Sequence, residues 1–305
     1  MSDFVQHQSV ECYFESSNSW VILSPIEQSI KKKIESVGIP LKDWDIQINY
    51  GIKTGFNDAF IINTEKRNEI LDSCSSEEER TKTAELIRPI LRGRDIQRYG
   101  YNWANLWIIA TFPSQHYNIE DYSAVKKHLL TYGINRLEQT GKEYNINGEK
   151  IKARKKTNNE WFETQDSINY WEDFNKPMVV WLELSDEPKF TLVQNMIPLN
   201  TVFFLTGEHV IHLLGLLNSK LITWYFKNCI GTTSGVGTNR WLKYTIEKIP
   251  MLPYSKNIEE CSNMLVLNSS SKTNVSEIEH HLLLDICIGY GLTADETNYI
   301  INLNT

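Results

Sequence analysis

Apolar positions alternate with polar ones, or run together, over several short stretches of the chain, and these patterns predict β-strands. Residues 44–52, WDIQINYGI, alternate and lead directly into a glycine-containing turn. The run KPMVVWLEL at residues 176–184 is apolar and β-branched enough to form a buried strand. Further runs of strand length are AFIIN (59–63), WANLWIIATFP (103–113), FTLV (190–193) and TVFFL (201–205).

Helical spacing of apolar residues separates these runs. After a short strand at residues 20–23, Ser24 has the chemistry of an N-cap, Pro25 suits the first helical position, and Gly38 with Pro40 ends the helix. The charged segment 65–86 is expected to be helical in part. Two longer helices are predicted at 119–141, with Asp121 as N-cap and Val125, Leu129 and Leu130 on one face, and at 209–228, with a broad apolar stripe that belongs to the core.

The order of these elements predicts a mixed α+β fold, in which helices flank a twisted mixed or antiparallel sheet. We expect one domain over residues 1–254, with residues 1–45 as a lead-in strand and helix. The polar stretch 255–273 is expected to be a linker. Residues 274–305 form a helical tail, interrupted by Gly289 and Gly291, that packs back on the domain.

Composition excludes several classes of protein. The 305 residues carry a net charge of -7, so the chain is not a generally cationic nucleic-acid binder, and any DNA-facing surface must be local. Five scattered cysteines without zinc spacing indicate reduced thiols. Without an apolar signal segment or a run of membrane-spanning length, we expect a cytoplasmic protein that does not contact membranes.

A glycine-rich turn and an arginine cluster carry the first candidate chemistry. In GIKTGFN, glycines at 51 and 55 allow positive φ and close approach of backbone N–H groups to a ligand, beside Lys53, Thr54 and Asn57. In residues 86–100, four arginines (Arg88, Arg92, Arg94 and Arg98) face one aspartate, a balance of +3. Arginine forks suit phosphate oxygens and guanine edges. The alternatives are a solvated basic helix face, or an Arg–Asp pair that holds a turn.

A second basic segment covers residues 142–159. It reads as a polar surface loop, and its portion 142–156 has six basic residues against two glutamates, or +4. Lys150, Lys152, Arg154, Lys155 and Lys156 would neutralise phosphates and make binding depend strongly on salt. A polar loop without a partner is the alternative. Arg240 follows a Gly/Thr/Ser-rich loop that we expect to be flexible and to face DNA.

Taken in order, GIKTGFNDAFII, LRGRDIQRY, the WANLWIIATFPS strand, the KP-preceded strand, LLNSKLITWYF and GYGL resemble the TaqI-like C-terminal specificity domain. This is the target-recognition module of Type IIG restriction-modification enzymes and related adenine-specific DNA methyltransferases. The resemblance implies that the chain binds double-stranded DNA and works with an N-terminal methyltransferase or endonuclease domain or subunit. It also implies that S-adenosylmethionine belongs to that catalytic part, with no cofactor in this chain.

No catalytic motif is expected in the chain itself. The NPPY-like tetrapeptide and the cofactor-binding glycine-rich turn of adenine methyltransferases do not occur. Glu187-Pro188-Lys189 spells the E-x-K of metal-dependent nucleases, but proline disfavours the strand that such a pair requires. His209 and His212 are three residues apart and lack further ligands for a metal.

Two hypotheses follow for the function. The first is a sequence-specific module for double-stranded DNA. The second is an assembly subunit that binds a partner methyltransferase without reading DNA. In the first, Asp95 orients an arginine fork, and the residues expected at the DNA are Lys53, Thr54, Asn57, Arg92, Arg94, Arg98, Lys152, Arg154, Lys155, Lys156 and Arg240.

Overall fold

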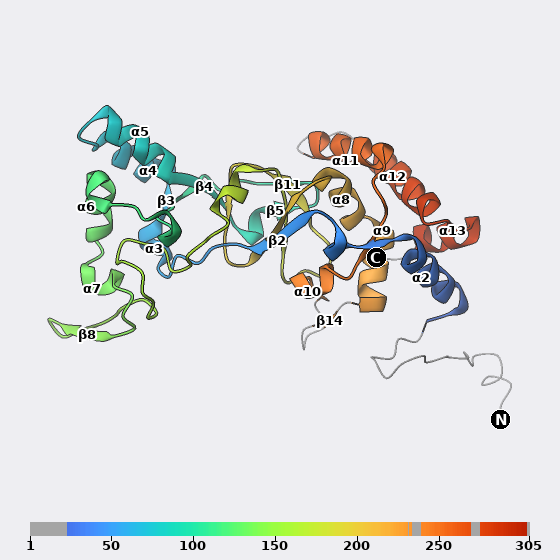
Figure 1. Cartoon of the computed structure of the whole chain (residues 1–305), viewed down its shortest axis with the longest axis horizontal. Coiled ribbons are helices and arrows are strands. Elements are labelled where there is room, and N and C mark those ends of the chain that lie inside the picture. The colour runs from blue at the N-terminus through green and yellow to red at the C-terminus, as the bar shows by residue number, and fades with distance from the viewer. Residues whose placement is uncertain (1–22, 231, 234–238, 270–274, 304–305) are drawn as a thin grey trace, which may run out of the picture. The chain divides into compact units, whose positions relative to one another are not determined.

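The computed structural model describes residues 23–230, 232–233, 239–269 and 275–303. These residues form two compact units. Within the described part of the chain, unit 1 comprises residues 23–46, 184–189 and those from 208 onward, and unit 2 comprises residues 47–183 and 190–207. The predicted mixed α and β composition is confirmed, and Figure 1 shows how the elements follow one another.

Unit 2 is built on two four-stranded sheets, with strand orders β11-β10-β13-β2 and β12-β4-β7-β3. Strand β10 is antiparallel to β11 and β13, and β7 is antiparallel to β3 and β4, whereas β12 and β4 are parallel. The strands are β2 (Ile46–Tyr50), β3 (Ile61–Asn63), β4 (Ile87–Leu91), β7 (Leu106–Ile109), β10 (Met178–Leu182), β11 (Thr191–Val193), β12 (Ile197–Pro198) and β13 (Val202–Gly207).

The sheet that contains β4 and β7 is buried on both faces. On one face, Ile90 and Ile108 join a core that also contains Val180 of β10 and Phe204 of β13. On the other face, Ile109 and its neighbours join a second core that is formed with helices. Those helices are α3 (Asn57–Phe60), α4 (Thr64–Asp72), α5 (Glu77–Leu86), α6 (Ser123–Leu130) and α7 (Ile134–Leu137).

The helix predicted at 119–141 differs in three respects. Asp121 is not its N-cap, because it ends a 3-10 turn and α6 begins only at Ser123. Leu130 is 41% exposed and does not share the buried face. The helix also breaks at Gly133, where φ is +81°, before α7 begins.

Unit 1 begins with helix α2 (Pro25–Val37), and its predicted ends are confirmed. Ser24 is the N-cap, and its backbone N–H and hydroxyl both donate to the Glu27 carboxylate. Pro25 occupies the first position, and Gly38 is the C-cap. Of the strand expected at 20–23, only Leu23 lies within the described residues, and it is not in a strand.

The apolar stripe predicted at 209–228 is buried, but it does not lie on one continuous helix. Helix α8 (Val210–Leu217) ends, and α9 (Lys220–Tyr225) starts anew, because the Ser219 hydroxyl accepts the N–H of Ile222 as a fresh N-cap. A π-helical turn, Phe226–Ile230, follows. Shorter elements of unit 1 are β1 (Ile39–Pro40), β14 (Thr232–Thr233), β15 (Asn239–Arg240), α10 (Lys243–Ile246) and β16 (Pro250–Met251).

The segment expected to be a polar linker, 255–273, is a helix over most of its length. Helix α11 (Lys256–Asn268) buries Ile258, Ser262 and Leu265 at helical spacing and packs on α8 and α12. The few apolar residues on this face were too sparse to be recognised among polar ones. The tail forms α12 (Ser276–Gly289) and α13 (Ala294–Asn302), and it breaks, as predicted, at Gly289 and Gly291.

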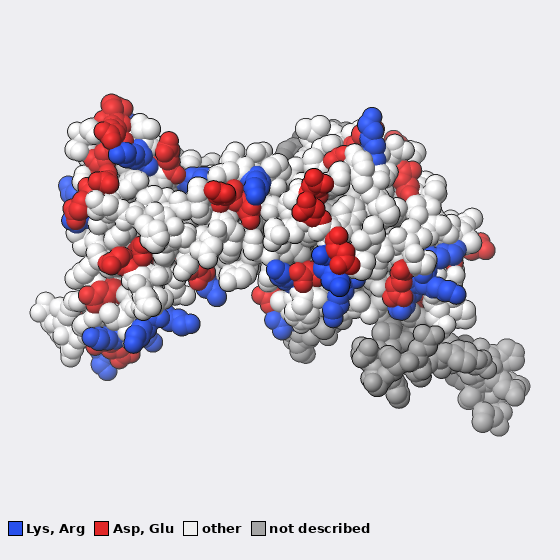
Figure 2. Space-filling view, in the orientation of Figure 1, with Lys and Arg blue, Asp and Glu red and all other residues white. Residues whose placement is uncertain are grey.

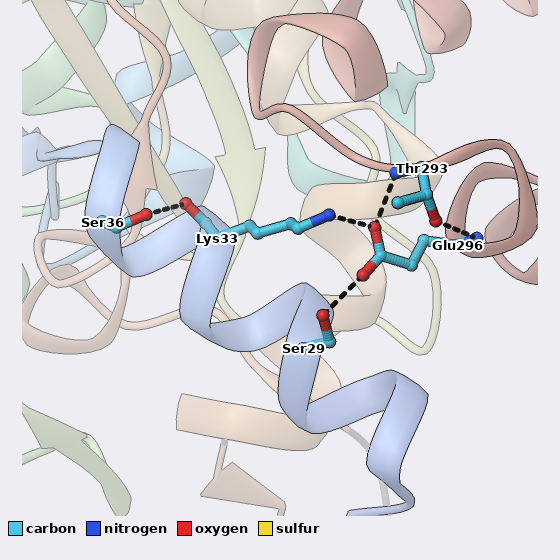
Figure 3. A network of polar contacts seen from close by, with 5 residues as sticks. All are labelled: Ser29, Lys33, Ser36, Thr293 and Glu296. Carbon is cyan, nitrogen blue, oxygen red and sulfur yellow. Dashed lines mark hydrogen bonds and ion pairs between the residues drawn. The ribbon is translucent and has the colours of Figure 1, made fainter.

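Two carboxylates join helix α13 to α2, and at one of them, Glu27, the Tyr299 hydroxyl donates a hydrogen bond of 2.8 Å. Glu296 accepts hydrogen bonds from Lys33 and Ser29 of α2, at 2.6 Å each, and from the backbone N–H of Thr293. Figure 3 shows these side chains converging on the carboxylate. Burial raises the pKa of Glu296, but these hydrogen bonds outweigh it and bring the pKa to about 2.

Candidate nucleic-acid interface

Three backbone segments of unit 2 end at the same edge. Ile52 pairs in parallel with Leu199, which directly follows β12, and β12 in turn is parallel to β4. Chain segments that run in parallel leave a sheet at the same end. The turn that begins at Lys53 and the turn that begins at Arg92 therefore lie at one edge, although 38 positions separate them in the chain.

Gly51 serves this edge differently from what the sequence suggested. Its N–H donates to the carbonyl of Val202 at 2.7 Å, so it is not available to a ligand. A Cβ at this position would lie 2.1 Å from the carbonyl oxygen of Leu199. The glycine is required by close approach of two backbones within the unit. Gly55, in contrast, has the expected positive φ, +78°.

The first turn places Lys53 and Asn57 at the surface and Thr54 inside. The backbone N–H of Lys53 donates to Asp166 at 2.9 Å, which fixes the start of the turn. Thr54 is 1% exposed, and its hydroxyl donates to Asn57 and accepts the N–H of Phe56. Thr54 thus shapes the turn and offers no exposed group for DNA, contrary to expectation.

The second turn is held by an Arg–Asp pair. Arg92 donates from Nε and Nη2 to the two carboxylate oxygens of Asp95, at 2.9 and 2.7 Å, and its backbone N–H donates to the same group. Asp95 is buried, and the hydrogen bonds raise the pKa of Arg92. The role expected for Asp95 is confirmed. Arg94, inside the turn, is exposed.

Two other arginines of the cluster lie elsewhere on unit 2. Arg98 is exposed at the tip of a hairpin formed by β5 (Ile96–Gln97) and β6 (Gly100–Tyr101), and its Cζ lies 5.1 Å from the ring centroid of Tyr99. Arg88 is half-buried on β4 and donates to Asn175 at 2.8 Å.

The basic segment expected to be a loop is a hairpin. Strands β8 (Glu143–Ile146) and β9 (Glu149–Lys152) are joined by Asn147 and Gly148, both with positive φ. The Asn-Gly dipeptide between alternating residues is the signal that predicts such a two-residue turn, and it was missed. Lys150, Lys152, Lys155 and Lys156 are exposed, as expected of a surface segment. Figure 2 shows Lys and Arg side chains along the region of α7 and β8, with acidic side chains beside them, and mostly acidic ones in the region of α4 and α5.

Arg154 corrects the prediction for this segment, because it is 2% exposed. Its guanidinium lies 5.0 Å from the ring centroid of Phe60. Burial, together with the charge of Arg136, lowers the pKa of Arg154 to about 10, so it stays charged at neutral pH. It donates hydrogen bonds of 2.7 to 3.0 Å to four backbone carbonyls: those of Thr54, Leu137, Trp161 and Glu163.

Through these hydrogen bonds Arg154 links the first turn to the basic hairpin. It follows β9 by two residues and reaches the carbonyl of Thr54 in the turn. Arg136, which the sequence analysis did not single out, supports the same region: its Nη1 donates to the carbonyl of Lys152, and its guanidinium covers the ring of Phe56 at 4.1 Å. No local sequence signal marks either role.

The remaining candidates lie in unit 1. Arg240 is half-buried on β15 and forms a β-bridge with Leu184. Most of the loop before it, residues 231 and 234–238, is outside the described residues. The expectation that this loop faces DNA therefore concerns residues that the structure does not describe.

The alternative catalytic and metal motifs do not assemble into sites. Glu187-Pro188-Lys189 lies outside any strand, as the proline predicted. The buried His212 ring contacts the carbonyl of Leu252 at 3.0 Å. Within the described ranges, no three His, Cys, Asp or Glu side chains are grouped as metal ligands.

Among the helices of the described chain, none is both long and apolar enough to cross a membrane.

Comparison with known proteins identifies the relatives of this fold. The family model described as the TaqI-like C-terminal specificity domain matches residues 88–251, more than half of the chain. The Type IIL restriction-modification enzyme MmeI, solved in complex with DNA, is similar over 87% of this chain at 13% identity and a TM-score of 0.52. The Type IIG restriction endonuclease BpuSI is similar over 90% at 12% identity and a TM-score of 0.53.

The chain spans only about a third of these two proteins, 36% of MmeI and 31% of BpuSI. At such low identity the likeness concerns the fold alone. No curated protein sequence matches the chain significantly.

Proposed function

Because the chain belongs to the family of TaqI-like C-terminal specificity domains, we propose that it recognises a specific sequence in double-stranded DNA. It does so for a Type IIG restriction-modification enzyme or an adenine-N6 methyltransferase. The catalytic domain or subunit, together with S-adenosylmethionine, lies outside this chain. The structural relative MmeI was solved with DNA, which agrees with this partner.

One observation carries the proposal: two sequence-distant turns with exposed basic or amide side chains leave unit 2 at one edge. Arg94 lies in a turn that the buried Asp95 holds in place. The Arg94 side chain therefore projects from a fixed backbone. An arginine fork binds the O6 and N7 atoms of guanine, while Lys53 suits phosphate oxygens. Arg92 acts through Asp95 as a positioning residue.

The test is selection from a randomised duplex pool with the purified chain at two salt concentrations, followed by sequencing of the retained duplexes. Enrichment of one short string supports recognition by this chain. Retention without enrichment, lost at the higher salt, would mean that only phosphate contacts form. No retention at either salt would contradict the proposal and favour the assembly subunit.

Arg94 sharpens the test through a pair of variants. Arg94→Lys keeps the charge but loses the planar fork, so we expect retention with a weaker preference for guanine at one base pair. Arg94→Gln should in addition weaken binding to every duplex. Lys82→Gln is the matched control, because Lys82 is exposed on the acidic helix α5, where it pairs with Glu78. Equal enrichment in Arg94→Lys and the unaltered chain would remove Arg94 from base recognition.

A further inference from the structure

Hairpin β8–β9 has two chemically different faces. Residues directly opposite each other in an antiparallel pair project to the same face, and successive pairs alternate. The pairs Asn145↔Lys150 and Glu143↔Lys152 therefore share one face, and Tyr144↔Ile151 and Ile146↔Glu149 share the other.

Near the base of the hairpin the second face packs against the rest of unit 2, whereas Ile146 and Glu149, near the tip of the same face, are exposed. Tyr144 and Ile151 are half-buried, and the Tyr144 hydroxyl donates to Glu138 at 2.6 Å. Asn145, Lys150 and Lys152, on the first face, are exposed. The first face, which carries one amide, two ammonium groups and the carboxylate of Glu143, is thus open along its whole length.

Hydrogen bonds fix the base of the hairpin, whereas no other described strand pairs with the rest of it. Backbone hydrogen bonds join Ala153 to Lys142 and Arg154 to Glu138, at 2.9 Å each, and the buried guanidinium of Arg154 holds the same base. Beyond this base the two strands form a sheet of their own, which pairs with no further described strand. An isolated two-stranded ribbon is only marginally stable. Contact with a partner would therefore stabilise this one.

We propose that hairpin β8–β9 is a β-ribbon that enters the major groove of DNA and directs Asn145 and Lys150 toward base edges. The major groove is about 12 Å wide and admits a two-stranded ribbon. Asparagine pairs with the N6 and N7 atoms of adenine, and lysine with the O6 and N7 atoms of guanine. Lys155 and Lys156, exposed next to the base, reach the phosphates that border the groove.

This inference rests on the proposed function and adds a second reading element to it. Duplex DNA is favoured over a protein partner by charge: the exposed charged residues of segment 142–156 are five lysines against two glutamates, and the pair Asn145↔Lys150 has no acidic member. Complementarity to a polyanion is the simplest account of an exposed ribbon of this composition.

The experiment compares Asn145→Ala and Lys150→Ala with the unaltered full chain in the randomised duplex selection. Ile146→Ala is the control, because Ile146 is the neighbouring residue on the opposite face. We expect each of the first two variants to keep binding DNA while its preference at one base pair falls by about five- to 150-fold. Ile146→Ala should retain the full pattern. Circular dichroism and gel filtration establish that all variants remain folded.

The outcomes separate this inference from the proposed function. If the unaltered chain enriches a string and both variants enrich the same string equally well, the hairpin does not read bases, although the chain does. A uniform loss of binding without a change in preference would mean that the hairpin contacts only phosphates, and it would contradict the proposal that the hairpin reads bases. If the unaltered chain retains no DNA, both proposals fail.

Discussion

At the scale of single residues, Gly51 and Gly148 are both glycines for different physical reasons. A Cβ on residue 51 would meet the Leu199 carbonyl at 2.1 Å, whereas a Cβ on residue 148 meets nothing within 4 Å but has a φ of +87°. Gly51→Ala should lower the free energy of unfolding by about 3 kcal/mol or more, because backbone must move. Gly148→Ala should cost only about 1–2 kcal/mol, the cost of the left-handed conformation. Urea unfolding of the two variants checks this order, and equal midpoints would contradict it.

Arg154 is a buried cation that forms no ion pair with a carboxylate among the residues the structure describes, yet four carbonyl oxygens accept its hydrogen bonds. Arg154→Ala leaves these acceptors without their donor, so we expect a loss of about 3 kcal/mol or more in the free energy of unfolding. Arg154→Lys should recover only part of it, because an ammonium group cannot reach four acceptors around a planar fork.

The control is Lys155→Ala, one residue further along and exposed, for which we expect a change within about 0.5 kcal/mol. Thermal unfolding measures the loss, and hydrogen exchange over residues 53–57 and 143–152 locates it. Faster exchange in both segments of Arg154→Lys supports the conclusion that Arg154 links the two segments. Unchanged exchange in either segment would limit Arg154 to general stability.

At the scale of elements, α13 is attached to α2 through the ionised carboxylate of Glu296 and through the Glu27–Tyr299 hydrogen bond. The pKa of Glu296 is about 2 in the folded chain, below its ordinary value of 4.5. A group with a depressed folded pKa contributes stability above its unfolded pKa, and this contribution is lost as pH falls through the folded pKa. Between pH 7 and pH 3 the attachment should therefore weaken by about 2 kcal/mol, given the partial exposure of Lys33.

Hydrogen exchange of residues 294–302 as a function of pH measures this weakening. Glu296→Gln should exchange faster at pH 7 and should lose the part of the pH dependence that comes from Glu296, while the Glu27–Tyr299 contact remains. Glu79→Gln is the control, because Glu79 also has a pKa of about 2 but holds Ser75, Ser123 and the Ala124 N–H in unit 2. If Glu79→Gln altered the exchange of α13 as strongly, the effect would not come from the Glu296 contacts.

The elements that could be predicted are those whose signals are local. The ends of α2 follow from Ser24, Pro25 and Gly38, and the central strand β10 follows from its apolar run. The break at Ser219 was not predicted, because the same hydroxyl can sit inside a helix or cap a new one, and tertiary packing decides between them.

The candidate site was predicted by residue type but not by arrangement. The sequence correctly predicted that Lys150, Lys152, Lys155 and Lys156 are exposed. Arg154, in the same run of basic residues, is buried. Only the carbonyls of segments up to 100 positions away distinguish it from Lys155, and those carbonyls meet through the fold. The shared edge of the two turns likewise depends on β12, more than 100 residues after either turn.

At the scale of the whole molecule, each unit is assembled from separated parts of the chain, so composition along the sequence does not reveal them. Unit 1 takes residues from both ends of the chain and a short insert at 184–189. Truncation after residue 254 would remove α11, α12 and α13, which pack on α8, α9 and α2. We expect the truncated chain to lose cooperative unfolding of unit 1, and differential scanning calorimetry against the full chain measures this. An unchanged transition would mean that the tail is dispensable.

The charge of the whole molecule sets the last prediction. With a net charge of -7, a duplex is repelled at long range, and binding depends on the exposed charges of residues 142–156, which are five lysines against two glutamates. Reversing Lys155 and Lys156 to glutamate should weaken binding to every duplex alike and make the slope of log affinity against log salt less steep by about 2, one for each lost phosphate contact. Lys82→Glu changes the net charge by the same amount per residue but lies on the acidic helix α5, so it should shift affinity slightly and leave the slope unchanged. Fluorescence anisotropy titrations over a series of salt concentrations distinguish the two. Equal slopes for the double reversal and the unaltered chain would show that these lysines do not contact DNA, and the effect of Lys82→Glu separates contact from overall charge.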